Sequence, residues 1–427
     1  MSKFIIHGGA RLEGEITVSG SKNAALPMLA ATLLTNEICV VHNVPRIADV
    51  DQMLTILRSL GARVDWVADH SVRIDASQVD GREPDYKQIK KIRASVLLIG
   101  PLLARLKRVT IPHPGGCHIG ARPIGVHIQA LEDLGAVVRT DNQLYYITAE
   151  RLRGKRIVLG EMSVTGTAVV VMAACLAEGT TEIRLAAAEP ETTNLLGMLQ
   201  GMGAKIGGID SHTLVIEGMG QLHGVETTVI PDRLEAGTLA IAAAITRGDV
   251  TIHGFMHSHL DIFIKKLRDA NVQLQILSDN SVRISRTTLL KAVNIRTDVY
   301  PGFPTDLQAP LAVLLTQANG TSLIFETMFE GRLNYFQELA RMGATANILD
   351  AHRAAINGPT VLYGKSIESL DIRAGATLIL AALIAHGRSE IDHIELIDRG
   401  YERIDEKLNA LGAQIERIEE VVSAAME

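Results

Sequence analysis

The sequence predicts an α/β protein of two domains, built from six repeated units with three units in each domain. The chain has 427 residues, which exceeds what one hydrophobic core usually serves, so two domains are expected. Apolar residues make up 47% of the chain and aromatic residues only 4%, so the cores must consist of Ala, Val, Ile and Leu. This composition is typical of α/β proteins.

The repeat appears as a short pattern that in most copies places two leucines, or a leucine and a methionine, before a glycine. Its six copies start 68 to 74 residues apart, at residues 57, 131, 199, 267, 339 and 408. In each copy we expect a helix to end, a glycine to adopt the left-handed conformation, and a strand to follow. Asn271 replaces the glycine in one copy. The nearly constant period indicates internal repeats.

A second series of Ala- and Leu-rich segments runs in phase with the first. Each segment predicts a helix, and five of the six are followed by a turn and a β-branched strand. The segments are residues 24–34, 93–106, 165–178, 235–247, 305–317 and 373–386. Each unit therefore carries two helices and several strands.

Charge and apolar runs exclude several classes of protein. The net charge is −6 and no long basic run is present, which argues against a nucleic-acid surface. The longest apolar runs, such as residues 168–177, have about half the length that spans a bilayer. Three cysteines do not form a disulfide framework, and the N-terminus lacks the apolar region of a signal peptide. We therefore expect a cytoplasmic protein without a membrane partner.

A glycine-rich segment at residues 114–123 predicts a loop, because three glycines and two prolines cannot continue a helix or a central strand. Cys39 and Cys175 lie in apolar runs and are expected to be buried. Cys117 instead lies on the polar loop, near Arg122 and two histidines, where a thiol can have the lowered pKa that reactivity requires. From composition alone, an ordinary surface turn explains the segment equally well.

The run Pro-Gly-Gly-Cys-x-Ile-Gly-Ala-Arg-Pro, followed by Val-His-Ile at residues 126–128, resembles the catalytic loop of the UDP-N-acetylglucosamine enolpyruvyl transferase family. The resemblance covers nearly the whole chain. It implies an inside-out α/β barrel in each domain, with helices inside and sheets on the outer faces. It assigns residues 22–231 to a first domain with the cysteine loop, and residues 1–21 and 232–427 to a second. The active site would lie between the domains, where ligand sites are favoured.

Lys22 and Asn23 stand at the start of a predicted helix, where a lysine makes a natural anion site. Capping with a solvated lysine explains the segment more simply, but the resemblance implies contact with phosphoenolpyruvate. Asp306 lies between Thr305 and Gln308, which form the pattern of a capping box. Capping would explain this segment without any catalytic role. The resemblance implies that Asp306 accepts the proton of the sugar 3-hydroxyl.

Five arginines stand in segments that match the family. Singly, each is most often a solvated surface residue, but together they suit substrates rich in phosphate and carboxylate. The resemblance implies that Lys22, Arg122 and Arg399 hold phosphoenolpyruvate. The full set of implied substrate-binding residues is Lys22, Asn23, Arg93, Arg122, Pro123, Ile124, Gly125, Val126, His127, Ser163, Val164, Thr165, Asp306, Met328, Glu330, Arg332, Asp371, Arg373 and Arg399.

The implied reaction is an addition followed by an elimination. The sugar hydroxyl attacks C2 of phosphoenolpyruvate while C3 is protonated, and loss of phosphate leaves an enolpyruvyl ether. Cys117 would serve as general acid at C3 or in product release, and Lys22, Asp306 and Arg399 complete the implied catalytic set. Cations around the phosphate would stabilise its departure. No metal or organic cofactor is required.

Two positions depart from the family. Gly125 stands where many members have aspartate, and Glu161 where some have a lysine that contacts phosphate. Both positions would contact the nucleotide. They therefore weaken the case for uridine diphosphate specificity unless Lys155, Arg156 or another cation compensates. A related transferase with a different nucleotide or nucleotide-sugar acceptor is therefore the alternative. One acting on shikimate 3-phosphate is less favoured because that enzyme lacks the Gly-Gly-Cys loop.

Two further alternatives belong to other classes. A metal enzyme is suggested by His253, His257 and His259, or by the Asp49-Val50-Asp51 run. The histidines surround a turn and Asp49 precedes a predicted amphipathic helix, so solvation and capping explain both. A catalytically inactive paralogue is the other alternative, and the joint presence of Lys22, Cys117, Asp306 and Arg399 argues against it.

Overall fold

The computed structural model describes residues 2–113, 123–141 and 143–419. These residues divide into two units. We call residues 19–113 and 123–231 the middle unit, and residues 2–18 and 232–419 the terminal unit. The chain passes between the units after Val18 and after Pro231, compared with the expected boundaries after residues 21 and 231. Ser21 lies in the middle unit because its N–H donates to the carbonyl of Ile230 at 2.8 Å.

The described part of the middle unit contains three sheets, with strand orders β13-β3-β5-β4, β6-β8-β7 and β11-β12-β10-β9. In each, the strand that follows a buried helix pairs with an antiparallel neighbour, β3 with β5, β6 with β8 and β10 with β12. The strands are β3 (Ile38–His42), β4 (Arg63–Ala68), β5 (Ser71–Asp75), β6 (Arg108–Pro112), β7 (Val137–Thr140), β8 (Leu144–Thr148), β9 (Arg156–Val158), β10 (Thr180–Arg184), β11 (Lys205–Gly207), β12 (Thr213–Glu217) and β13 (Glu226–Thr228).

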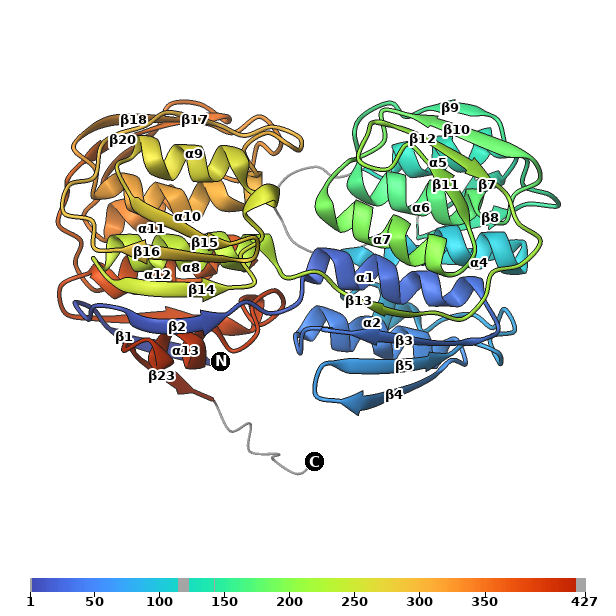
Figure 1. Ribbon diagram of the computed structural model, residues 1–427, viewed down its shortest axis with the longest axis horizontal. Helices are drawn as coiled ribbons and strands as arrows, with labels where there is room; N and C mark the ends of the chain where they lie inside the picture. Colours follow the sequence, from blue (N-terminus) through green and yellow to red (C-terminus); the bar gives the residue numbers. More distant parts are fainter. Residues whose placement is uncertain (1, 114–122, 142, 420–427) are drawn as a thin grey trace. The chain divides into compact units, whose positions relative to one another are not determined.

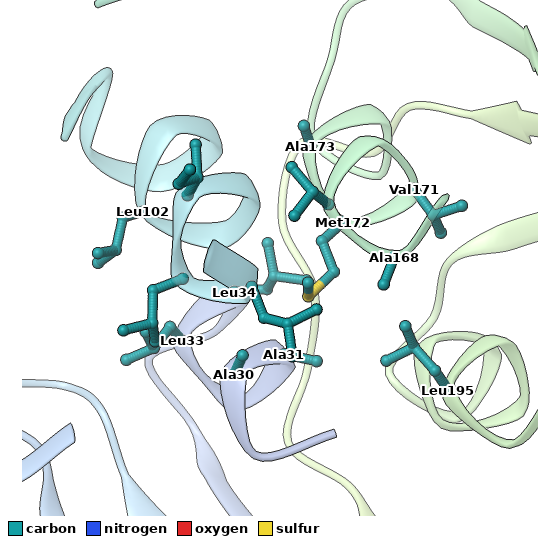
Figure 2. Packing of buried hydrophobic residues seen from close by; sticks show 14 of the residues in the cluster. Ala30, Ala31, Leu33, Leu34, Leu102, Ala168, Val171, Met172, Ala173 and Leu195 are labelled. Carbon is teal, nitrogen blue, oxygen red and sulfur yellow. The ribbon is translucent and has the colours of Figure 1, made fainter. Parts of the chain in front are cut away.

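Helices fill the interior of the middle unit. The helices are α1 (Lys22–Ala31), η1 (Thr32–Leu34), α2 (Ala48–Ser59), α3 (Tyr86–Ile89), η2 (Arg93–Leu98), α4 (Ile99–Leu106), α5 (Gly125–Asp133), α6 (Val164–Ala174) and α7 (Pro190–Gly201). Figure 2 shows Leu34, Leu102, Met172 and Leu195, from four of these helices, gathered in the core. Residues 166–174 of α6 are all buried, because this helix has no charged side chain on any face.

The described part of the terminal unit also contains three sheets, with strand orders β15-β16-β14-β2, β17-β18-β20-β19 and β21-β22-β1-β23. β1 lies between β22 and β23 and runs antiparallel to both, and β2 runs parallel to β14. The strands are β1 (Lys3–His7), β2 (Glu13–Thr17), β14 (Asp249–His253), β15 (Gln273–Ser278), β16 (Ser281–Ser285), β17 (Ile295–Arg296), β18 (Gly320–Phe325), β19 (Thr345–Ile348), β20 (Arg353–Gly358), β21 (Ser366–Glu368), β22 (Arg388–Asp392) and β23 (Gln414–Ile418).

The terminal unit again has buried helices inside its sheets (Figure 1). α10 packs against both α8 and α12, and every residue of α8 is buried. The helices are α8 (Arg233–Ile245), η3 (His257–His259), α9 (Asp261–Asp269), α10 (Thr305–Thr316), α11 (Tyr335–Arg341), α12 (Ile372–Ile384), η4 (Ile394–Leu396) and α13 (Ile404–Ala410). The predicted inside-out α/β arrangement is therefore confirmed in each unit.

The repeat predicted from the sequence is visible in the backbone. The left-handed position after each repeated helix is confirmed, with φ of 100° at Gly61 and Gly135, 98° at Gly203, 67° at Asn271, 106° at Gly343 and 101° at Gly412. A strand follows each of the six Ala- and Leu-rich segments, where the sequence predicted five. Helix α6 ends at Ala174, four residues before the predicted end at Glu178. In the described ranges, no helix is both long and apolar enough to cross a bilayer.

Candidate active site

Lys22 begins helix α1 and forms a close ion pair. Ser21 caps the helix, its Oγ accepting from the Ala24 N–H at 3.4 Å. Lys22 Nζ lies 2.6 Å from Asp49 Oδ2, and the two side chains are 11% and 6% exposed. Lys22 is therefore not a solvated lysine, and Asp49 orients its ammonium group. The neighbouring Asn23 is exposed.

The expected capping role of Asp49 is wrong. Helix α2 begins at Ala48, so Asp49 lies inside its first turn and not before it, and Ile47 is the N-cap without a side-chain hydrogen bond. The histidines of the metal alternative also have other partners. His253 Nε2 lies 2.9 Å from Glu15, and His257 lies 3.9 Å from Asp279. Across the described ranges, no three His, Cys, Asp or Glu side chains form a group that could hold a metal ion.

Two of the cysteines are buried, as the sequence predicted. Cys39 and Cys175 are fully buried, and burial raises the pKa of Cys39 to about 11 and that of Cys175 to about 12. Neither thiol therefore ionises at neutral pH. Cys117 and Arg122, two of the predicted site residues in the glycine-rich loop, lie outside the described residues.

His127, Thr165 and Arg93 come together from three elements of the middle unit. His127 on α5 is 2% exposed, and its Nε2 lies 2.9 Å from Thr165 Oγ1 on α6. The other ring nitrogen, Nδ1, has no hydrogen-bond partner among the described groups. Burial and the nearby charge of Arg93 lower the pKa of His127 to about 4. His127 is therefore a neutral imidazole at physiological pH.

The N-terminal ends of α5 and α6 lie next to each other. Ser163 caps α6 by accepting from the Gly166 N–H at 3.1 Å. A Cβ atom at Gly166 would lie 3.2 Å from a methyl group of Val126, which shows how closely the two helix ends approach. Helix N-termini attract anions, so this pair of ends suits a phosphate group. Of the other predicted residues here, Pro123, Gly125 and Val164 are exposed and Ile124 is buried; Glu161 is exposed as well.

In the terminal unit, Asp306 lies between two arginines. Arg332 Nη1 is 2.5 Å from Asp306 Oδ1, and Arg373 Nη2 is 3.2 Å from Oδ2. The aspartate side chain is 19% exposed, and those of Arg332 and Arg373 are 10% and 8% exposed. Burial alone would raise the pKa of Asp306. The charges of Arg332 and Arg373, with a smaller effect from Arg233, outweigh burial and hold this pKa well below its usual range.

The capping box predicted around Asp306 is wrong. Pro304 is the N-cap of α10, and no side chain caps the helix. Thr305 Oγ1 donates to Glu326 Oε2 at 2.7 Å and accepts from Arg332 Nη1 at 2.9 Å. Gln308 Nε2 donates to the carbonyl of Arg332 at 3.3 Å. Both residues thus hold the segment that carries Arg332, because tertiary partners compete successfully with local capping.

Asp371 and Tyr401 place the guanidinium group of Arg373. Asp371 is the N-cap of α12, and its carboxylate accepts from the N–H groups of Arg373 and Ala374 at 2.7 and 3.0 Å. The Tyr401 ring centroid lies 5.1 Å from Arg373 Cζ. Burial would lower the pKa of Arg373, but Tyr401 and Asp306 raise it above its ordinary value, so Arg373 stays charged.

Two buried N–H groups of this cluster face no described partner. Arg373 Nη1 and Arg332 Nε make no hydrogen bond within the described part of the chain. Buried donors of this kind usually find a partner. A bound carboxylate or phosphate would supply acceptors for both, and guanidinium groups suit such anions.

The remaining predicted residues lie near this cluster in sequence. The Met328 N–H donates to Glu326 Oε1 at 2.8 Å, Glu330 is exposed and Arg399 is half-buried. Asp398, next to Arg399, accepts two hydrogen bonds from Arg417 at 2.8 and 2.9 Å. The sequence reasoning did not find the parts played by Asp49, Arg233, Glu326 and Tyr401, because their partners come from other segments of the chain.

The fold agrees with the comparisons with known proteins. The family model of EPSP synthase (3-phosphoshikimate 1-carboxyvinyltransferase) matches residues 6–408. The crystal structure of the enolpyruvyl transferase NikO from Streptomyces tendae is similar, with a TM-score of 0.89 and 26% identity over 98% of this chain and 99% of that one. An EPSP synthase structure from Acinetobacter baumannii gives a TM-score of 0.75 at 20% identity and shares the fold. This chain belongs to the carboxyvinyltransferase, or enolpyruvyl transferase, family.

Within the family, several similar relatives share one name. The UDP-N-acetylglucosamine 1-carboxyvinyltransferase of Koribacter versatilis is 44% identical over 99% of this chain and 98% of the relative. The protein of the same name from Methylacidiphilum infernorum is 46% identical over 98% of this chain and 99% of the relative. That from Gloeobacter violaceus is 45% identical over 96% of this chain and 90% of the relative.

Proposed function

We propose that this chain transfers the enolpyruvyl group of phosphoenolpyruvate to the 3-hydroxyl of UDP-N-acetylglucosamine and releases phosphate. This is the first committed step of peptidoglycan precursor synthesis. The full-length similarity to proteins of that name supports the reaction. The structural observation that carries it is the ionised Asp306 between two buried arginines, one or both of which can also bind an anionic substrate.

Asp306 would accept the proton of the attacking sugar hydroxyl. A carboxylate whose pKa is held low is always ionised but is a weak base. Proton transfer is therefore expected to follow the formation of the new C–O bond, because the hydroxyl proton becomes more acidic as that bond forms. The unpartnered Arg332 Nε and Arg373 Nη1 would donate to the carboxylate of the pyruvyl group.

Other predicted residues would bind the rest of the two substrates. Lys22, Asn23, Arg122 and Arg399 would hold the phosphate of phosphoenolpyruvate, and Cys117 would protonate C3 or assist product release. The nucleotide sugar would contact residues that include the ends of α5 and α6, whose dipoles favour its diphosphate. Its expected contacts are Arg93, Arg122, Pro123, Ile124, Gly125, Val126, Ser163, Val164, Thr165, Asp306 and Met328. The predicted substrate-binding set also includes His127, Glu330 and Asp371.

The reaction would take place in the cytoplasm and support growth of the cell wall, and through it cell shape and division. Both substrates are small anions, so no nucleic-acid or membrane partner is required. The chain's net charge of −6 gives no general attraction for them. Their binding would depend on the local cations of the site.

Phosphate release from phosphoenolpyruvate tests the proposal, with UDP-N-acetylglucosamine present or absent. We expect phosphate release only with the acceptor. Treatment with fosfomycin should abolish the release, because this drug alkylates the loop cysteine of this family. Mass spectrometry should show the drug on wild-type protein and not on the Cys117→Ser variant. Labelling of Cys117 without acceptor-dependent release would contradict the proposed acceptor and point to another one, selected by Gly125 and Glu161.

A further inference from the structure

Glu326 is a buried carboxylate that does not belong to the predicted set of site residues. It follows strand β18 directly and is 0% exposed. Its Oε1 accepts from the N–H groups of Met328 and Phe329 at 2.8 and 3.2 Å, and from the Thr297 hydroxyl at 3.0 Å. Its Oε2 accepts from the Thr305 hydroxyl at 2.7 Å. Such hydrogen bonds offset the cost of burying a carboxylate, and they fix its position.

Through its Oε2 atom, Glu326 is connected to Asp306 by way of Thr305 and Arg332. The Thr305 hydroxyl has one proton, and donating it to Glu326 leaves its lone pairs free to accept from Arg332 Nη1 at 2.9 Å. The same Nη1 atom lies 2.5 Å from Asp306 Oδ1. Glu326 therefore sets the direction of the Thr305 hydroxyl, and that hydroxyl sets the position of the guanidinium group beside Asp306.

Through its Oε1 atom, Glu326 is connected to Arg332 by way of the backbone after β18. The hydrogen bonds to Met328 and Phe329 close a turn directly after β18. The ring centroid of Phe329 lies 5.1 Å from Arg332 Cζ, a distance at which cation and ring attract each other. Glu326 thus supports Arg332 both through the hydroxyl and through the aromatic ring.

We propose that Glu326 is a positioning residue for the enolpyruvyl transfer, because it holds Arg332 in register with Asp306. The inference rests on the proposed function. A purely structural support of the turn would involve Met328 and Phe329 but would not require Thr305. The two explanations therefore differ in what the loss of the Thr305 hydroxyl does to catalysis.

The test compares Glu326→Gln, Thr305→Val, Thr305→Ser and the double variant Glu326→Gln/Thr305→Val. We expect kcat to fall about 10- to 100-fold in the first two, since a small misplacement of a catalytic group has effects of this size. Thr305→Ser keeps a hydroxyl and should retain at least about fivefold more kcat than Thr305→Val. The kcat of the double variant should be only slightly lower than that of the less active single variant, because both changes break the same chain of hydrogen bonds from Glu326 through Thr305 to Arg332.

Two matched controls separate catalysis from folding. Glu338→Gln removes a carboxylate that binds Arg341 on α11, and Thr316→Val removes a buried hydroxyl at the other end of the helix that carries Asp306. Both should keep kcat within about twofold of wild type. A Thr305→Val enzyme as active as Thr316→Val, or additive losses in the double variant, would overturn the inference. If the wild-type enzyme itself showed no acceptor-dependent phosphate release, the proposed function would be overturned, and the inference with it.

Discussion

Asp306 keeps its charge in surroundings where burial alone would favour the neutral acid. Arg332 and Arg373 lie within 3.2 Å of its two oxygens, and their charges hold its pKa well below the usual range. The same pairing prepares the arginines, because it fixes two guanidinium groups that each retain one buried N–H without a described partner. In the proposed reaction, this one carboxylate would serve both as the proton acceptor and as the support of an anion site.

The variant Asp306→Asn tests both roles. We expect kcat to fall about 100- to 10,000-fold, the usual range for a general base. The free energy of unfolding should fall by about 3 kcal/mol, because two buried arginines lose their counterion. Acceptor-dependent phosphate release and thermal melting measure the two effects. Asp350→Asn, which removes the carboxylate partner of Arg353 in a more exposed pair, is the control and should change stability by less than about 1 kcal/mol.

The pH dependence of that stability difference follows from the lowered pKa. A depressed carboxylate pKa adds stability that is fully present above the unfolded-state pKa, about 3.9, and is lost as the pH falls through the folded-state value. The gap in melting temperature between wild type and Asp306→Asn should therefore stay constant from pH 8 to pH 5. It should narrow only below about pH 4. A gap that shrinks between pH 8 and pH 5 would show that Asp306 titrates there, against the pairing with Arg332 and Arg373.

At the scale of single elements, one glycine inside helix α7 and one just after it are in opposite situations. Gly197 lies in the middle of the helix on its exposed face, and a Cβ atom there would meet nothing within 4 Å. Gly203 follows the helix with φ of 98°, and the nearest atom to an added Cβ would be 3.4 Å away, on His223. Space is adequate at both positions. Only the backbone conformation distinguishes them.

Alanine substitution should therefore change stability in opposite directions at these two positions. Gly203→Ala should lower the free energy of unfolding by about 1 kcal/mol, because the left-handed conformation disfavours a Cβ atom. Gly197→Ala should raise it by about 0.5–1 kcal/mol, the difference in helix propensity. Denaturant titration of both variants measures the changes. Equal effects of the two substitutions would contradict the role assigned to the left-handed glycine of the repeat.

The sequence predicted the elements better than the site. Helices such as α6 and α8 could be predicted because apolar residues cover all their faces, and the glycine after each repeated helix marked its end. The capping box at Thr305 and the cap at Asp49 were wrong for a common reason. Both patterns are local, whereas the actual partners, Glu326 and Lys22, lie more than 20 residues away. Resemblance located Asp306 and Arg373, but nothing in the local sequence reveals that they form an ion pair.

At the scale of the whole molecule, the described part of the middle unit lies between residues 19 and 231, whereas the described part of the terminal unit comes from both ends of the chain. The strands and the core of the middle unit come from residues 19–231 alone. The terminal unit needs both ends of the chain, because β1 forms an inner strand between β22 and β23 and β2 pairs with β14. Lys3 of β1 lies opposite Ile418 of β23, so the first and last described strands are neighbours.

This arrangement predicts which fragments fold. Residues 19–231 should fold alone and give a dispersed NMR spectrum and a cooperative thermal transition, because this fragment keeps every strand of the three sheets described for that unit. Residues 232–427 alone should not, since removing β1 leaves β22 and β23 without the strand that joins them. A permuted fragment that runs from residue 232 to 427 and continues with residues 1–18 should recover the fold, because neighbouring chain ends tolerate such joining. If residues 232–427 gave the same dispersed spectrum and transition as the permuted fragment, β1 and β2 would be dispensable, and the N-terminal strands would be an addition to the unit and not part of its core.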